Sequence, residues 1–320
     1  MSHAHELLAA LEGRDRVLLT GPTGPDGDSL GACLAFQRVL AARGIQASVA
    51  GVVPRRYRWM PGIDTVIPDP RVTGRWPAVV VMDGDRHRLT PQVGKAFAEA
   101  DFRGIVDHHS STRPDGYEVA WIEPQTGSAC EMLHAALPDW QVALDRDLAT
   151  LLYTGIVFDT GGFRHANTTP QTLRVAASLL ELGVDHAGIV SRILHERTEP
   201  GLRLSGTIYS GLDRRCGGAL AIGRATHVEL AGVADGDLEG VPENLLQVEN
   251  VEVSALLLQR DDEVKYSLRS RGLVDVAKVA AALAPTGGGH PRAAGAIVRD
   301  HLDGAADRLE AVVSRALAGA

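Results

Sequence analysis

Acidic residues and histidines gather in four short motifs in the first half of the chain. The motifs are Asp26-Gly27-Asp28, Asp83-Gly84-Asp85, Asp107-His108-His109 and Asp159-Thr160. Carboxylates and an imidazole brought together make a mixed oxygen and nitrogen ligand set, which suits Mn²⁺, with Mg²⁺ and Zn²⁺ as alternatives. Several carboxylates in one place would otherwise repel one another and raise each other's pKa. We therefore predict a site for one or two divalent cations.

Each motif by itself also fits a structural role. Asp28 or Ser29 could cap a helix after a turn, and Asp83 could cap another helix. Adjacent histidines such as His108 and His109 are common on protein surfaces. The occurrence of all four motifs in one chain favours the metal site over four separate structural explanations.

A second group of residues, in the last third of the chain, favours anion binding. The run Gly287-Gly288-Gly289-His290 would let the backbone approach a ligand, with N–H groups able to hold an anion. Arg269-Ser270-Arg271 adds guanidinium groups, which suit paired hydrogen bonds to phosphate, and Arg292 adds a further donor. A flexible loop is the alternative for the glycine run alone. Together, these residues predict a phosphate or carboxylate site.

The elements that must position the acidic motifs alternate between strands and helices. Apolar runs predict strands at residues 16–20, 47–53, 78–83 and 102–107. Helical spacing predicts helices at residues 29–43, 127–137, 145–158 and 170–182, the last with Thr169 as its N-cap. The segments between these strands are long enough for crossover connections, which indicates an α/β fold whose parallel sheet is covered on both faces. We expect all four motifs at or just beyond the carboxyl ends of strands, where such folds place their chemistry.

The second half of the chain predicts a smaller α/β unit. Strands are expected at residues 219–224, 251–259, 264–269 and 293–298, the middle two forming a hairpin. Helices are expected at residues 275–283, with Asp275 as N-cap, and at residues 302–317. The predicted division is a first domain of residues 1–185, a helical linker of residues 186–212 and a second domain of residues 213–320.

The composition of the chain argues against several functional classes. The 320 residues include 32 basic and 40 acidic side chains, a net charge of −8, which makes a long duplex nucleic acid a poor partner. The apolar runs are too short for a membrane span, and the N-terminus lacks the pattern of a secretion signal. The cysteines Cys33, Cys130 and Cys216 form neither a disulfide framework nor a CxxC pair. We therefore predict a cytoplasmic protein without a membrane partner.

The order of the motifs resembles that of the DHH/DHHA1 phosphoesterases. The resemblance rests on DGD, DHH, Asp159 and SLRS followed by GGGH, over roughly residues 14–300. Within that family the chain is similar to the bacterial nano-RNase and pAp phosphatase branch. The resemblance implies that residues 1–185 form a DHH lobe with two metal ions, usually Mn²⁺, and that residues 213–320 form a DHHA1 lobe that binds substrate.

The resemblance also implies a metal-ligand set. Asp28, Asp83, His108 and Asp159 match the ligands of one metal, and Asp26 matches a ligand of the other, which Asp83 bridges. In the family, a histidine four residues before the first aspartate completes the second site, and here that position is Pro22. Because proline cannot coordinate a metal, the second site is expected to be weak unless another side chain replaces the histidine. The nearby candidates are Asp85, His87, His3 and His5.

Catalytic and substrate-binding roles are implied in the same way. The positions that match catalytic residues of the family are His109, Asp107 and Asp83. In the family the residue that matches His109 faces the substrate phosphate, and the residue that matches Asp107 lies behind that histidine. The positions that match substrate-binding elements of the DHHA1 lobe are Arg269, Ser270, Gly287, Gly288, Gly289 and His290.

The implied activity is hydrolysis of short oligonucleotides to nucleoside monophosphates, and of pAp to AMP, by attack of metal-activated water on phosphorus. An aromatic content of 4% argues against a stacking platform for long single strands. Two alternatives remain: an enzyme for linear or cyclic dinucleotides or single-stranded DNA, and a nucleotide sensor with little activity, suggested by Pro22. Mg²⁺ as the metal and a homodimer as the assembly also stay open.

Overall fold

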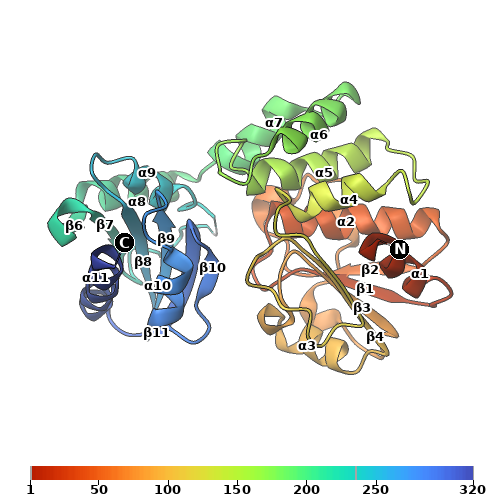
Figure 1. Cartoon of the computed structure of the whole chain (residues 1–320), viewed down its shortest axis with the longest axis horizontal. Coiled ribbons are helices and arrows are strands. Elements are labelled where there is room, and N and C mark those ends of the chain that lie inside the picture. The colour runs from red at the N-terminus through yellow and green to blue at the C-terminus, as the bar shows by residue number, and fades with distance from the viewer. Residues whose placement is uncertain (1, 235, 320) are drawn as a thin grey trace. The chain divides into compact units, whose positions relative to one another are not determined.

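Valine- and leucine-rich strands form a five-stranded parallel sheet in the N-terminal part of the chain (Figure 1). The strand order is β2-β1-β3-β4-β5. The strands are β1 (Val17–Thr20), β2 (Ala47–Ala50), β3 (Ala78–Met82), β4 (Phe102–Asp107) and β5 (Val119–Ile122). Alternate side chains of a strand enter different apolar clusters, since Val17 and Leu19 belong to one cluster and Leu18 to another. The predicted parallel sheet, buried on both faces, is confirmed, and β5 is an additional strand.

Helices cover both faces of this sheet. The helices of this part are α1 (His3–Leu11), α2 (Gly27–Ala42), α3 (Pro91–Ala98), α4 (Ala129–Ala136), α5 (Arg146–Asp159), α6 (Pro170–Glu181) and α7 (His186–Val190). Figure 1 shows α2, α4 and α5 on one side of the strands and α3 on the other. Thr169 caps α6 as predicted, its hydroxyl accepting a hydrogen bond from the N–H of Thr172. The sequence did not predict α1 or α3.

This computed structural model describes residues 2–234 and 236–319. The chain divides into two units, Met1–Glu196 and Arg197–Ala320, and the division lies within the segment where a linker is expected. That segment contains α7, a π-helical turn η5 (Ser191–His195) and the first residues of the second unit. No helix among the described residues combines the length and apolar character needed to cross a membrane.

The C-terminal unit is a smaller α/β layer structure around a six-stranded sheet of order β10-β11-β9-β8-β7-β6. The strands are β6 (Asp213–Arg215), β7 (Leu220–Ala225), β8 (Val253–Arg260), β9 (Glu263–Ser270), β10 (Gly288–His290) and β11 (Ala293–Arg299). The helices are α8 (Glu199–Ser210), α9 (Val241–Leu246), α10 (Val276–Leu283) and α11 (Leu302–Ala318). Residues of α10 and α11 pack on one face of the sheet, and residues of α8 and α9 on the other.

The sequence predicts the longer elements of this unit and misses the short ones. The hairpin of β8 and β9 and the Asp275 cap of α10 are confirmed. The strands β6 and β10 and the helix α9 were not expected. The glycine run, for which a loop was one alternative, forms the edge strand β10, which pairs antiparallel with β11.

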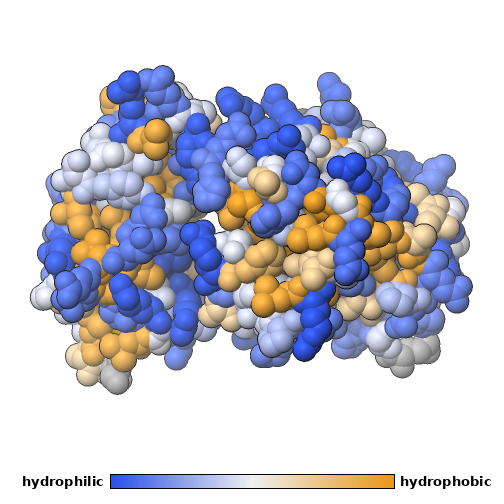
Figure 2. Space-filling model, turned by 90° about the horizontal axis from the view of Figure 1, so that it is seen from above, coloured by the Kyte–Doolittle hydropathy of each residue, from blue (hydrophilic) through white to orange (hydrophobic). Residues whose placement is uncertain are grey.

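Apolar residues also reach the surface of the first unit. Figure 2 shows orange, hydrophobic residues among blue ones in the view from above. Three exposed leucines lie on or just after α6: Leu173, Leu180 and Leu182. Such scattered residues are ordinary for a folded protein and by themselves define no binding surface.

Candidate metal centre

Three of the four acidic motifs lie at the carboxyl ends of parallel strands. Asp26 follows β1 as the N-cap of α2, Asp83 directly follows β3, and Asp107 ends β4. The prediction that the fourth motif follows a strand is wrong, because Asp159 is the last residue of helix α5. Its side chain nevertheless reaches the same place, with Oδ2 lying 2.7 Å from Nε2 of His108.

The first motif serves two structural functions at once. Oδ1 of Asp26 accepts hydrogen bonds from the N–H groups of Asp28 and Ser29, both at 3.0 Å, and so caps α2. Asp28 is fully buried, and its carboxylate accepts hydrogen bonds from the first N–H groups of α4, those of Ala129 at 2.6 Å and Cys130 at 2.9 Å. The N–H groups at the N-terminus of α4 therefore hold the carboxylate of Asp28 in place.

Asp28, Asp83 and His108 form a group whose ligand atoms all lie within 4.8 Å of one another. Nε2 of His108 lies 3.4 Å from Oδ1 of Asp83 and 4.0 Å from Oδ2 of Asp28. The same imidazole contacts the carbonyl oxygen of Thr126 through Nδ1, at 3.2 Å. Because a carbonyl only accepts, this contact assigns a proton to Nδ1, so the nitrogen that would bind a metal is Nε2, which lies 2.7 Å from Oδ2 of Asp159.

Asp83 belongs to a second group as well, together with Asp107 and His109, again within 4.8 Å. Its backbone is left-handed, with φ of 58°, which turns the carboxylate toward the motifs that follow the neighbouring strands. Asp83 is 2% exposed, and within the described residues its Oδ1 is a buried oxygen that receives no hydrogen bond. A bound cation would provide the partner that this buried carboxylate oxygen needs.

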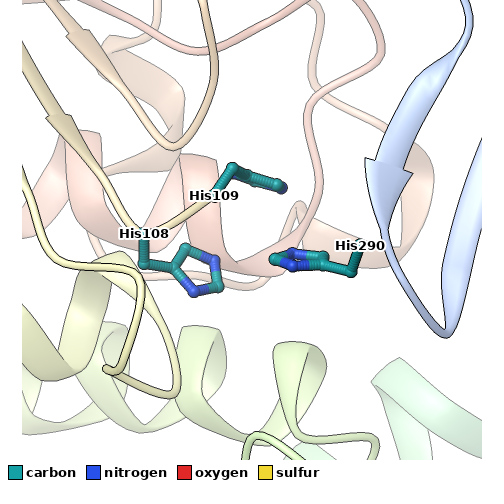
Figure 3. Close-up of side chains that lie close together, drawn as sticks. All are labelled: His108, His109 and His290. Carbon is teal, nitrogen blue, oxygen red and sulfur yellow. The ribbon is translucent and has the colours of Figure 1, made fainter. Parts of the chain in front are cut away.

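Asp107 orients His109. Its Oδ1 accepts from Nδ1 of His109 at 2.6 Å, and the hydroxyl of Thr112 donates to Oδ2. Figure 3 shows the imidazoles of His108 and His109 leaving the loop that follows β4. The side chain of His109 is 22% exposed, whereas that of His108 is 2% exposed. His109 is thus the histidine of the pair that solvent or a substrate can contact.

The electrostatics of the centre fit a bound cation. Burial, followed by repulsion from Asp83 and Asp159, raises the pKa of Asp26 to about 8 and that of Asp28 well above its usual range. Burial alone would lower the pKa of His109, but the hydrogen bond to Asp107 and the charges of Asp83 and Asp107 raise it to about 9. Burial would also lower the pKa of His108, but its contacts with Asp159 and Asp83 raise it.

These shifts predict how stability changes with pH. A group whose pKa is raised by folding contributes stability that is lost as the pH rises through the folded value, here about 8 for Asp26 and about 9 for His109. Burial would raise the pKa of Asp107, but its hydrogen bond with His109 lowers it, so its contribution is lost only in acid. Metal-free protein should therefore melt at a lower temperature at pH 9 than at pH 6.

A divalent cation should reverse this trend, because it binds the deprotonated carboxylates and its affinity rises as protons leave. Calorimetric melting in chelator, and then in excess Mg²⁺, measures both effects across the same pH range. A melting temperature of the metal-free protein that stays level or rises from pH 6 to pH 9 would contradict this account of the centre.

The candidate replacements for the family's histidine do not belong to the groups of close ligand atoms among the described residues. The ligand groups found among residues 2–234 and 236–319 include neither Asp85, His87, His3 nor His5. His87 has a side chain 77% exposed and lies near Asp85 instead. Pro22 is buried, and its ring carbons lie 3.2–3.3 Å from where a Cβ on Gly84 would stand.

The residues that hold the centre in place through the segment after β5 were not predicted from the sequence. Nδ2 of Asn167 donates to the carbonyls of Gly127, at 2.8 Å, and Asp159, at 3.3 Å. The N–H of Gly127 in turn donates to the buried carboxylate of Glu131, at 3.2 Å. The segment that carries the Thr126 carbonyl is therefore tied to Asp159. A glutamate among apolar residues in ACEMLHAA was a signal of this role, whereas nothing marked Asn167.

The predicted anion-binding residues of the second unit already have partners in the chain. Nε of Arg269 donates to Oε1 of Glu243 at 2.5 Å. The Ser270 hydroxyl donates to Oε1 of Glu252 at 3.0 Å, and the same oxygen accepts from the N–H groups of Gly272, Leu273 and Val274. This loop therefore has the donors of an anion site, and Glu252 occupies several of them.

The fold requires a glycine at two positions of the run and not at the third. A Cβ on Gly287 would lie 2.0 Å from the carbonyl oxygen of Ala280, and one on Gly289 would lie 2.5 Å from that of Ala293. Folding alone therefore requires these two. A Cβ on Gly288 would meet nothing within 4 Å, and its φ is not in the left-handed region. Gly288 is the glycine of the run whose small size the fold does not explain.

Comparison with known proteins adds family and fold relationships. Residues 16–156 match the description "DHH family, N-terminal domain", and residues 223–318 match "DHHA1 domain". The bifunctional oligoribonuclease and PAP phosphatase NrnA of Thermus thermophilus is 34% identical over 309 residues, which cover 96% of this chain and 91% of the relative. A probable bifunctional oligoribonuclease and PAP phosphatase NrnA of Streptococcus mutans is 26% identical over 91% of this chain and 92% of the relative.

Two crystal structures are similar in fold. An exopolyphosphatase-related protein from Bacteroides fragilis matches 98% of this chain and 96% of its own with a TM-score of 0.86, at 23% identity. The exonuclease RecJ bound to manganese matches 98% of this chain and 94% of its own with a TM-score of 0.56, at 16% identity. At these identities the structures establish the shared fold.

Proposed function

The chain belongs to the DHH family, as its motifs predicted, and from this premise we propose that it cleaves short 5′-phosphorylated RNA to nucleoside monophosphates and converts pAp to AMP. It is a hydrolase of phosphoester bonds. The observation that carries the proposal is the buried cluster of Asp28, Asp83 and His108, whose ligand atoms lie within 4.8 Å of one another, with Oδ2 of Asp159 lying 2.7 Å from Nε2 of His108. The names of the NrnA relatives support the substrate class.

The residues of the centre fit two divalent cations, Mn²⁺ or Mg²⁺. Asp28, Asp83, His108 and Asp159 would hold one, and Asp26 with Asp83 would hold the other more weakly, because Pro22 provides no ligand. Cations bound there would lower the pKa of water and polarise phosphoryl oxygens. The chain's own contribution is to hold the ligands: α4 orients Asp28, and the Thr126 carbonyl orients His108.

His109 is the residue that we assign to the scissile phosphate. Its Nδ1 is engaged by Asp107, so the ring nitrogen that would face a phosphate is Nε2. A protonated imidazole at this position would stabilise negative charge that develops on the phosphoryl oxygens. Asp107 is a positioning residue, because it acts through His109.

For the second unit we propose substrate binding by Arg269, Ser270, Gly287, Gly288, Gly289 and His290. Nε of Arg269 donates to Glu243 and Nη1 to the carbonyl of Leu268, at 2.9 Å, so a contact with phosphate would fall to Nη2. The donors around Ser270 are shared with Glu252, so a substrate phosphate would have to compete with that carboxylate.

The direct test is product analysis with purified protein. In Mn²⁺, a 5′-phosphorylated diribonucleotide should yield mononucleotides, and pAp should release phosphate, while excess chelator should stop both reactions. A protein that binds nucleotides but turns over neither substrate would support the alternative of a sensor, which Pro22 favours, and would overturn the proposed hydrolysis. Cytoplasmic location and a homodimer stay predictions.

Replacing Gly288 with alanine tests whether a ligand approaches the backbone there, without disturbing the fold. Because a Cβ at this position meets nothing within 4 Å, the melting temperature should stay within about 1–2 °C of wild type. If a ligand approaches the backbone there, KM should rise severalfold while kcat changes little. The matched Gly287→Ala variant should instead destabilise the unit, since its Cβ would lie 2.0 Å from the Ala280 carbonyl. Unchanged KM in Gly288→Ala would remove this strand from the binding site.

Replacing Pro22 with histidine tests the asymmetry of the centre. The variant supplies an imidazole beside Gly84, the residue that follows Asp83. It should tighten the weaker site and raise turnover at low Mn²⁺, which a titration of activity against Mn²⁺ measures. Two tight sites of equal affinity in the wild-type protein would overturn the predicted asymmetry.

A further inference from the structure

Arginines and aromatic residues cluster on the loop that follows β2. The sequence Arg55-Arg56-Tyr57-Arg58-Trp59 begins with the 3₁₀ turn η1 (Arg55–Tyr57), five residues after the end of the strand. Because β2 neighbours β1 in a parallel sheet, this loop leaves the same carboxyl edge as the Asp26 motif. The function proposed above makes no use of these side chains.

A further basic residue joins the cluster from another segment of the same unit. The guanidinium of Arg192, in η5, stacks over the ring of Trp59, 5.0 Å from its centre. Nη1 of Arg56 donates to the carbonyl of Ile193 at 3.2 Å, which ties η1 to η5. Nε1 of Trp59 donates to the Arg56 carbonyl at 2.5 Å, which orients the indole within the loop.

Tyr57 connects this cluster to the metal centre. It is 2% exposed and packs edge-on against Phe158, the residue before Asp159, with ring centres 6.4 Å apart. A Cβ on Gly27, between Asp26 and Asp28, would lie 2.8 Å from Phe158 and 3.4 Å from the Tyr57 ring. The arginine cluster is therefore anchored directly beside the first acidic motif.

The charge of the cluster is opposite to that of the chain. Arg55, Arg56, Arg58 and Arg192 bring four positive charges, and Glu196, 3.8 Å from Arg55, offsets one of them. The chain as a whole carries −8. Such a local reversal next to an anionic catalytic edge attracts phosphate groups to that edge.

We propose that Arg55, Arg58, Arg192 and Trp59 form a subsite for the part of an oligonucleotide beyond the nucleotide being cleaved, the arginines binding backbone phosphates and Trp59 with Arg192 supporting a base. This inference rests on the proposed function and adds to it a preference for substrates longer than a dinucleotide. Guanidinium groups suit phosphate oxygens, and an aromatic ring beside them suits a nucleobase face without regard to sequence.

A purely structural explanation exists for part of the cluster. The contacts of Arg192 with Trp59 and of Arg56 with Ile193 would hold η5 on η1 whether or not RNA binds. Arg55 and Arg58 are the better probes, because their side chains are exposed and neither takes part in those packing contacts. Glutamine keeps the aliphatic stem of each and removes the charge, so the double variant Arg55→Gln/Arg58→Gln should fold as wild type does.

The experiment compares 5′-phosphorylated RNA of two and five nucleotides. In the double variant, the ratio of KM for the pentanucleotide to KM for the dinucleotide should rise about tenfold. The dependence of pentanucleotide binding on salt should also weaken, by about 0.7 in logarithmic slope for each phosphate that the variant no longer binds. Arg174→Gln is the matched control, because Arg174 is exposed on α6 and its guanidinium donates a hydrogen bond to the nearby side chain of Gln171.

An unchanged KM ratio, or an equal loss with both substrates, would overturn the subsite. Fluorescence anisotropy measures binding of the pentanucleotide in the presence of chelator. Because it needs no turnover, it tests the subsite independently of the proposed hydrolysis. If wild-type protein cleaves neither RNA, the hydrolysis proposal fails. The subsite then stands only if the double variant binds the pentanucleotide about tenfold more weakly than the wild type does.

Discussion

Replacing Asp83 with asparagine should reduce kcat for any phosphoester substrate by about a thousandfold or more, equivalent to ~4 kcal/mol of transition-state stabilisation. In the proposed centre Asp83 is a ligand of both cations, so a neutral amide should weaken both cation sites at once. Asparagine is the suitable replacement, because it tolerates the left-handed backbone at this position, where φ is 58°. Steady-state kinetics and the melting temperature of the variant measure the two effects separately.

Asp85→Asn is the matched control for this variant. Asp85 lies two residues away and caps a short helical turn through the N–H of His87, but it belongs to none of the ligand groups among the described residues. Its replacement should leave kcat within about twofold of wild type. Comparable losses in both variants would mean that the loop after β3 responds to any change of charge, and that Asp83 has no special position.

Replacing Gly155 with alanine should damage both folding and metal binding. Gly155 lies in α5, and a Cβ there would stand 2.4 Å from Oδ1 of Asp28 and 2.4 Å from Sγ of Cys130. Both neighbours are buried, so the methyl group must push Asp28 away from the N-terminus of α4 or separate the helices. We expect a loss of roughly 1–3 kcal/mol in unfolding free energy, as for other overpacked cores, and weaker Mn²⁺ binding.

Gly94→Ala makes the same chemical change in another helix with the opposite expected sign. Gly94 lies in α3 with nothing within 4 Å of its Cβ position, so alanine should stabilise the protein by roughly 0.5–1 kcal/mol through helix propensity. Denaturant unfolding of both variants gives the comparison. A Gly155→Ala protein that is as stable as wild type and binds Mn²⁺ equally well would show that Asp28 is not held as described.

The sequence could predict the elements with strong internal patterns. Strands such as β3, five buried apolar residues followed by Asp83, indicate both their type and the site that follows them. The capped helix α6 was equally clear from Thr169 and Pro170. The order of the motifs then identified the family. A parallel sheet brings the carboxyl ends of its strands to one edge, so the motifs that follow separate strands could be expected to lie together.

What the sequence could not predict depends on contacts between distant segments. The strand β5 is only four residues long and follows a polar loop, so its pattern is weak until β4 provides a partner. Asp159 was expected to follow a strand, but the helix α5 carries it to the same edge. The role of Asn167 depends on two carbonyl groups, 40 and 8 residues away in the chain, which no local pattern reveals.

The central claim is that the centre around Asp83 binds divalent cations and that hydrolysis depends on them. A single titration of metal-free protein with Mn²⁺, in which bound ion is counted by electron paramagnetic resonance and turnover of a 5′-phosphorylated diribonucleotide is measured in the same samples, tests it most directly. We expect two unequal binding steps, with turnover absent at first and rising as the weaker site fills. Full turnover in the metal-free protein, or turnover that rises while no Mn²⁺ binds, would contradict the account.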